Sequence, residues 1–113
     1  MRADDVQRNL AELSRELVSL LGDYQRANED RARKEAAYKA AYAAAYLAAE
    51  GNIEERKQRA VLTTADQYRD AELAAVLFDN VRAALRVLGQ RLDAGRTIAS
   101  TIRAEAIATG VGT

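Results

Sequence analysis

The sequence contains no cysteine and no histidine. These residues are the commonest ligands of zinc, and cysteine also provides thiol nucleophiles and disulfide bonds. Histidine is the side chain that most often changes its charge near neutral pH. Their absence removes the usual zinc sites, thiol chemistry and imidazole-based catalysis, and we expect no metal site and no cofactor.

Proline is also absent, and aromatic residues make up only 5% of the 113 residues. Proline interrupts helices, whereas alanine, glutamate, arginine, leucine and glutamine, which fill most of this sequence, favour them. With no tryptophan and one phenylalanine, the apolar surface must come mainly from leucine, isoleucine, valine and alanine. The composition predicts an all-α protein with a helix content well above the usual third.

Long apolar runs are missing as well. The sequence has no stretch of about eighteen apolar residues that could cross a membrane as a helix. The N-terminal residues MRADDVQRNL lack the apolar centre of a secretion signal. We therefore expect a cytoplasmic protein without membrane association.

Neither sign of charge is in excess, because 17 basic side chains balance 17 acidic ones. The distribution is uneven, since residues 81–113 carry five basic and two acidic side chains. Arginines in this segment could follow a phosphate backbone or pair with carboxylates of the same or a neighbouring chain. The sequence leaves both roles open for Arg82, Arg86, Arg91, Arg96 and Arg103.

One strong turn signal divides the chain. Gly51 can adopt the left-handed conformation that ends a helix, and Asn52 with Glu55 has the spacing of a capping box. Gly22 interrupts the apolar pattern of the first helix, and the sequence leaves open whether the helix has a kink or a short break there. We predict a single domain (1–113) that forms an elongated antiparallel helical hairpin, with a first arm at about 3–50, a turn at 51–52, a second helix at about 53–109 and a frayed tail at 110–113.

The second helix carries a seam of apolar residues, mostly three or four positions apart, as in helices that pack on one another. The first arm is polar on every face between Gln25 and Glu35, so it offers little apolar surface to cover this seam. We therefore expect homo-oligomers that form through the C-terminal helix. The predicted interface is Leu77, Val81, Leu85, Leu88, Leu92, Ile98 and Ile102.

Three tyrosines, Tyr38, Tyr42 and Tyr46, follow one another in four-residue steps and share one stripe of the first helix. They can pack on the second helix with their hydroxyl groups at the edge of the contact. They can also offer a stacking platform for nucleic-acid bases, with help from neighbouring cations. The residues alone leave both interpretations open.

Catalytic motifs are missing. The sequence has no phosphate-binding glycine loop, no dinucleotide-binding fingerprint and no nucleophile elbow. The adjacent carboxylates Asp4–Asp5 and Glu54–Glu55 do not face each other on a helix. They suit helix N-termini, where negative charge is favourable. We expect no enzymatic activity and no catalytic residues.

The order of features in the second half of the chain resembles a known family. A tyrosine-bearing helix is followed by the glycine-containing turn and then by Glu55-Arg56-Lys57, Val61-Leu62-Thr63-Thr64-Ala65-Asp66, a long apolar-patterned helix, Gly95-Arg96-Thr97-Ile98 and Ile102-Arg103-Ala104. Over residues 36–108 this order resembles the UvsY-type recombination mediators of phages and small helical proteins of actinobacterial phages. The turn and residues 61–66 are its most distinctive parts.

The resemblance implies a non-enzymatic mediator that binds single-stranded DNA and helps a RecA-like recombinase to replace a single-strand binding protein. It also implies ring-like homo-oligomers and, for a phage protein, a location in the host cytoplasm. The phage mediators have a basic motif just before the turn; this chain keeps Lys39 but continues with alanines. The candidate DNA-binding residues therefore lie on both sides of the turn: Arg31, Arg33, Lys34, Lys39, Tyr42, Arg56, Lys57 and Arg59.

Two alternatives come from other classes of protein. A structural assembly protein, such as a phage scaffold or a coiled-coil adaptor without DNA binding, would need only the balanced charge and the apolar seam. A secreted helical hairpin of the mycobacterial kind would carry a Trp-x-Gly motif at its turn, and this sequence has no tryptophan. Self-association together with DNA binding would distinguish a mediator from a scaffold.

Overall fold

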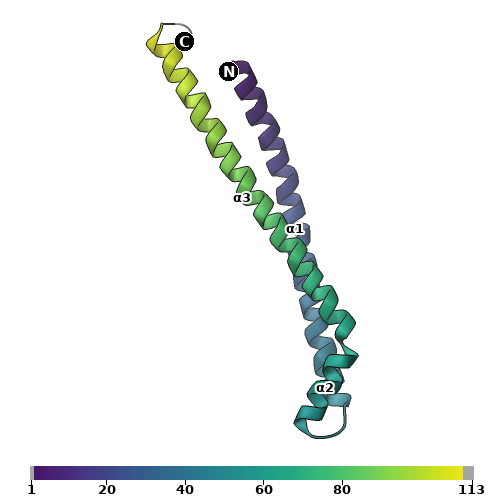
Figure 1. The fold of residues 1–113 in the computed structure, drawn as a ribbon. Helices are drawn as coiled ribbons and strands as arrows, with labels where there is room; N and C mark the ends of the chain where they lie inside the picture. The colour runs from purple at the N-terminus through teal and green to yellow at the C-terminus, as the bar shows by residue number, and fades with distance from the viewer. Residues whose placement is uncertain (1, 111–113) are drawn as a thin grey trace. The chain divides into compact units, whose positions relative to one another are not determined.

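The structure is a computed structural model that describes residues 2–110 (Figure 1). Three helices make up nearly all of this range: α1 (Ala3–Ala48), α2 (Ile53–Thr63) and α3 (Ala65–Ala108). The described residues contain no strand, which confirms the all-α prediction. Of the predicted frayed tail, residues 111–113 lie outside the described residues.

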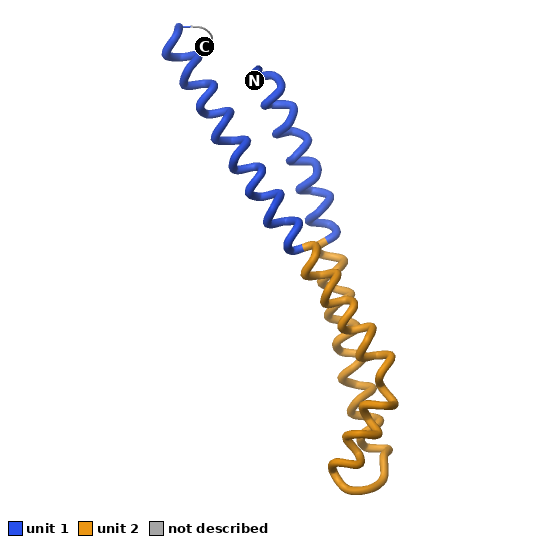
Figure 2. The backbone as a smooth tube through the Cα atoms, in the orientation of Figure 1, with its two compact units in different colours: residues 1–23, 82–113 blue, residues 24–81 orange. Residues whose placement is uncertain are grey.

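The chain forms two compact units, which Figure 2 shows in different colours. Unit 1 consists of residues 1–23 and 82–113, so it pairs the first part of α1 with the second part of α3. Unit 2 is residues 24–81 and contains the rest of α1, all of α2 and the first part of α3. Within each unit the segments of α1 and α3 lie side by side and run in opposite directions.

Leucine side chains hold unit 1 together. Three leucines form a buried cluster and three more pack around it: Leu13, Leu88 and Leu92 at the centre, and Leu10, Leu17 and Leu20 at the edge. On α1 these leucines are three or four residues apart, so they share one face of the helix. Leu10 also lies over Gly95, where an added Cβ would be only 2.7 Å from Leu10 Cδ2. The glycine therefore makes room for the leucine.

Unit 2 is packed with smaller side chains and with rings. Its buried residues are Ala60, Thr64 and Ala74, each at most 4% exposed. All six aromatic side chains of the sequence belong to this unit. The rings of Tyr24 and Phe78 have centroids 5.2 Å apart, a separation at which aromatic pairs attract each other. In unit 2, contacts between aromatic rings thus hold the helices together, as contacts between leucines do in unit 1.

The turn between α1 and α2 lies where the sequence predicts it. Gly51 has a φ of +109°, in a region that residues with a Cβ rarely adopt. The side chain of Asn52 accepts a hydrogen bond from the backbone N–H of Glu55, with a donor–acceptor distance of 2.9 Å. This bond satisfies one of the N–H groups that the first turn of α2 leaves without a helical partner. The predicted N-cap is confirmed.

The short break that the sequence left open near Gly22 is absent, because α1 is one continuous helix from Ala3 to Ala48. A glycine inside a helix costs roughly 1 kcal/mol relative to alanine. The neighbouring turns are anchored, since Leu20 packs on the leucine cluster of unit 1 and Tyr24 packs on a ring of unit 2. Burying one large apolar side chain contributes about 1.5–3 kcal/mol, which exceeds the cost of the glycine.

The prediction of one uninterrupted second helix is also wrong. α2 ends at Thr63 and α3 begins at Ala65, with Thr64 between them at φ −108° and ψ 17°. The hydroxyl groups of Thr63 and Thr64 donate hydrogen bonds to the carbonyl oxygens of Arg59 (2.8 Å) and Ala60 (2.7 Å). Threonines that bond back in this way bend helices. The N–H of Thr64 still donates to Ala60 at 3.1 Å, so the interruption is a kink and not a loop.

We expect Leu88→Ala to lower the free energy of unfolding by about 2–5 kcal/mol, because it removes buried methyl groups and leaves a cavity. Leu88 is 5% exposed, whereas Val18, the control, is 72% exposed. Val18→Ala should change the free energy of unfolding by less than about 0.5 kcal/mol. Urea denaturation followed by circular dichroism measures both changes. Equal losses in the two variants would contradict the assignment of the leucine cluster as the core of unit 1.

Candidate nucleic-acid interface

The eight residues predicted to bind DNA all belong to unit 2. Five of them lie on α1 and three on α2: Arg31, Arg33, Lys34, Lys39 and Tyr42, then Arg56, Lys57 and Arg59. The structure divides this set into two groups. Four side chains are half-buried, and four are exposed.

Arg31 is held inside the unit. Its guanidinium carbon is 5.0 Å from the centroid of the Phe78 ring, within the range of a cation–π interaction. Its Nη2 donates to Asn28 Oδ1 at 2.9 Å, and its Nη1 donates to Glu35 Oε2 at 3.2 Å. Arg31 Nε is buried and has no hydrogen-bond partner among the described residues. This side chain therefore packs α1 against α3 and offers little to a ligand.

Arg31 and Lys34 show how residues 25–35, which offer little apolar surface, pack within unit 2. Ala27, Arg31, Lys34 and Tyr38 are spaced by four, three and four residues, and all four are half-buried. They continue on α1 the spacing of the leucine seam. Long cationic side chains can cover apolar surface with their methylene stems while their charged ends reach water. The polar composition of residues 25–35 gives no sign of this half-buried face. The three- and four-residue spacing that continues from the leucines could have predicted it.

Arg56 has a similar role at the other side of the turn. Its guanidinium carbon lies 5.7 Å from the centroid of the Tyr46 ring, and its Nε is buried without a hydrogen-bond partner among the described residues. The contact joins α2 to the end of α1. Together with Arg31, it shows that two of the predicted DNA-binding arginines serve the packing of unit 2.

The exposed group consists of Arg33, Lys39, Lys57 and Arg59. Lys39 forms an ion pair with Glu35, with its Nζ 3.0 Å from Glu35 Oε1. Its side chain is nevertheless 71% exposed, so the ammonium group remains accessible to an anionic ligand. The structure thus leaves four of the eight predicted residues as accessible cations on α1 and α2.

The tyrosines of the predicted stripe are half-buried. The ring centroid of Tyr38 lies 5.3 Å from that of Tyr68 on α3 and 6.2 Å from that of Tyr42, in both cases edge to face. Tyr38 therefore packs on the second half of the hairpin, as in the structural interpretation of the stripe. Tyr68, which is not among the predicted site residues, is 51% exposed and is the most accessible ring of this group.

Glu35 is the carboxylate that links the two groups of cations. The hydrogen bond from Lys39 and the charge of Lys39 lower the pKa of Glu35 below its ordinary value. Desolvation opposes this effect, and Arg31 adds a smaller attraction. Both cations lie four residues from Glu35 on the same helix, the spacing that brings side chains together on one face.

The seven residues predicted to form an oligomer interface lie in several environments. Leu88 and Leu92 are buried within unit 1 against α1. Val81, Leu85 and Ile102 are half-buried. Leu77 and Ile98 are 59% and 43% exposed. Part of the predicted seam therefore packs on the first helix of the same chain, and part of it is exposed.

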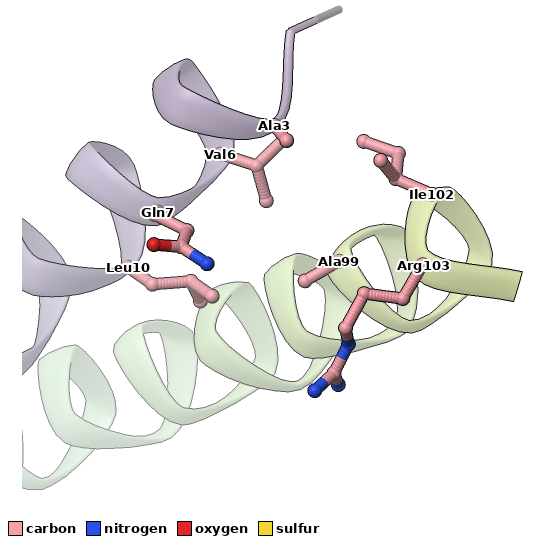
Figure 3. A pocket seen from close by; sticks show the side chains of 7 residues that line it. All are labelled: Ala3, Val6, Gln7, Leu10, Ala99, Ile102 and Arg103. Carbon is pink, nitrogen blue, oxygen red and sulfur yellow. The ribbon is translucent and has the colours of Figure 1, made fainter. Parts of the chain in front are cut away.

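A pocket of about 320 Å³ lies in unit 1 between the start of α1 and the later part of α3 (Figure 3). Val6 and Leu10 extend from α1 towards Ala99 and Ile102 on α3, so most of its wall is apolar. Its polar lining groups are the amide of Gln7 and the guanidinium of Arg103. An amide and a guanidinium provide no nucleophile and no general base at neutral pH, and the pocket suggests no chemistry.

Two further classes of site can be checked on the described residues. None of their carboxylates gather in a group of three or more that could hold a metal ion. None of their helices combines the length and the apolar character that a membrane crossing requires.

Comparison of the chain with protein-family models, with curated proteins and with solved structures finds no match in any of the three.

Replacing Lys39 by alanine should raise the pKa of Glu35, because Lys39 provides the two largest effects that lower it. A carboxyl group with a lowered folded-state pKa adds stability above its unfolded pKa, and this stability is lost as the pH falls through the folded-state pKa. NMR titration of the glutamate side-chain carboxyl carbons measures the shift. Arg33→Ala, which removes a cation that does not contact Glu35, is the control. An unchanged pKa in Lys39→Ala would contradict the ion pair.

Proposed function

We propose that the protein is a non-enzymatic recombination mediator that binds single-stranded DNA through unit 2. The observation that carries this proposal is the presence of four exposed cations, Arg33, Lys39, Lys57 and Arg59, on the helices that flank the turn, in the unit that holds every aromatic ring of the chain. Proteins that bind single strands combine cations for the phosphates with rings on which bases stack.

The proposed contacts divide between phosphates and bases. The ammonium and guanidinium groups of Lys39, Lys57 and Arg59 would contact phosphates, since each is exposed. Tyr68, with about half of its surface exposed, is the ring most accessible to a base. Arg31 and Arg56 would act indirectly, because their contacts with Phe78 and Tyr46 fix the helices that carry the exposed cations.

The charge of unit 2 limits the strength of this binding. The unit carries nine basic and ten acidic side chains, so it attracts phosphates only where cations are locally grouped. Each neutralised phosphate releases counterions, and the affinity falls as the salt concentration rises. We therefore expect binding that is clear at low salt and weak at high salt.

The other parts of the mediator proposal rest on the resemblance. By that resemblance the protein would act in the cytoplasm, contact a RecA-like recombinase and a single-strand binding protein, and form ring-like oligomers through its C-terminal helix. The exposed residues Leu77 and Ile98 are the members of the predicted interface most available for such contacts. A pull-down with a RecA-like recombinase would separate a mediator from a helix pair that merely binds DNA.

A structural assembly protein without DNA binding is the second candidate. The observation that favours it is a group of exposed apolar side chains near the turn: Leu47, Ile53, Val61 and Leu62, at 54% to 77% exposure. Exposed apolar side chains that gather in one region often mark protein contacts. An adaptor or scaffold would use them to bind another protein and would not need the cations.

The first test is the fluorescence anisotropy of a labelled single-stranded oligonucleotide titrated with the protein at several salt concentrations, with duplex DNA as a control. We expect preferential binding of the single strand. The double variant Lys57→Ala/Arg59→Ala should weaken it at least about tenfold and reduce the salt slope by about two, one for each lost phosphate contact. Arg86→Ala/Arg103→Ala, which removes two exposed arginines from unit 1, is the matched control.

The outcomes are distinct. Absence of binding at low salt would contradict the mediator and favour the assembly protein. Equal losses in the two double variants would show that binding depends on overall charge and not on the cations near the turn.

A further inference from the structure

Unit 1 has an open groove that its own two helices do not fill. The groove has a volume of about 590 Å³ and lies between residues 16–23 of α1 and residues 83–91 of α3. Its apolar lining consists of Leu20, Ala83, Ala84, Val87 and Leu88. A pair of helices can cover only the faces that they turn towards each other, so the lateral side of the leucine seam stays open to solvent.

Val87 is the most exposed large apolar side chain of this lining. It is 54% exposed, whereas Leu88 beside it is 5% exposed because it belongs to the buried cluster. Leu20 is half-buried at the edge of the same cluster. A side chain placed over Val87 and Leu20 would therefore extend the core of unit 1 outward.

The two rims of the groove carry opposite charges. Glu16 and Asp23 line it from α1, and Arg91 lines it from α3. Asp23 already interacts within the chain, so Glu16 is the acidic group available to a partner. Glu16 and Arg91 are both exposed. A partner that suits this groove needs an apolar centre, a cationic rim facing α1 and an acidic rim facing α3.

A second copy of this chain meets all three requirements. We propose that two copies pack groove to groove, with α1 of each copy lying over α3 of the other. The two-fold axis then runs parallel to the helices, every helix lies beside antiparallel neighbours, and the two copies form a four-helix bundle. The proposal concerns unit 1 alone and does not depend on DNA binding by unit 2.

The charges select this arrangement over the other two-fold arrangement. With α1 over α3, Glu16 of each copy faces Arg91 of the other, and Val87 of each copy lies over Leu20 of the other. An axis that runs across the helices would place α1 over α1 and α3 over α3. The acidic rims would then meet each other, as would the arginines, and like charges disfavour such contacts.

The first experiment measures the molar mass of the full chain by sedimentation velocity over a range of concentrations. The wild-type chain should show a concentration-dependent increase to at least twice its monomer mass. Val87→Glu should raise the dissociation constant at least about tenfold, because it places a carboxylate in the apolar centre of the interface. Val18→Glu is the matched control: Val18 is an exposed valine of unit 1 that does not line the groove. It should leave the mass unchanged.

Folding of the variants is checked by circular dichroism. Val87 and Val18 are both exposed, and glutamate has a higher helix propensity than valine, so both variants should keep the helical content of the wild type. A wild-type chain that remains monomeric at every concentration would overturn the proposal. A dimer that Val87→Glu and Val18→Glu affect equally would also overturn it.

A charge exchange tests the orientation of the two copies. Glu16→Arg and Arg91→Glu should each weaken the dimer, because each places like charges at both equivalent contacts. The double variant restores opposite charges and should recover most of the lost affinity. If the loss of dimer affinity in the double variant equals the sum of the losses in the two single variants, the placement of α1 over α3 is wrong. The DNA affinity of the Val87→Glu variant is measured as well. Because the dimer proposal does not depend on DNA binding by unit 2, a weaker dimer with unchanged DNA affinity supports it on its own.

Discussion

The packing of α1 against α3 along positions three and four residues apart is the constraint on which the rest of the structure depends. In unit 1 these positions hold leucines, and Leu13, Leu88 and Leu92 are removed from solvent. In unit 2 the corresponding positions of α1 include Arg31 and Tyr38, which meet rings of α3. One spacing thus supports two chemically different interiors, because helical geometry fixes where side chains lie and not what they are.

This constraint decides which charges remain available for a partner. A cation at a position that faces the other helix becomes part of the packing, as the contact of Arg31 with Phe78 and that of Arg56 with Tyr46 illustrate. Cations away from those positions, such as Lys57 and Arg59, stay in solvent. The proposed DNA site is therefore smaller than the basic composition near the turn suggests, and its position follows from the packing of unit 2.

The same constraint leaves apolar surface uncovered. Two helices bury one face each, and Val87 and Leu77 on α3 remain more than half exposed. In unit 1 the open surface is bordered by Glu16 and Arg91. These charges favour one orientation of a partner, which the apolar side chains alone do not. An apolar groove by itself accepts many partners. An acidic rim opposite a basic rim favours a partner that places a basic rim over the acidic one and an acidic rim over the basic one.

The sequence by itself determined the helices, the turn at Gly51 and the cap at Asn52, because propensity, left-handed backbone and capping depend on residues within one or two turns of the chain. Only the tertiary structure decided that α1 continues through Gly22 and that Leu88 is buried while Leu77 is exposed. It also decided which arginines face a ring. These features depend on side chains far apart in the sequence that meet only when the helices pack, and no local pattern records that meeting.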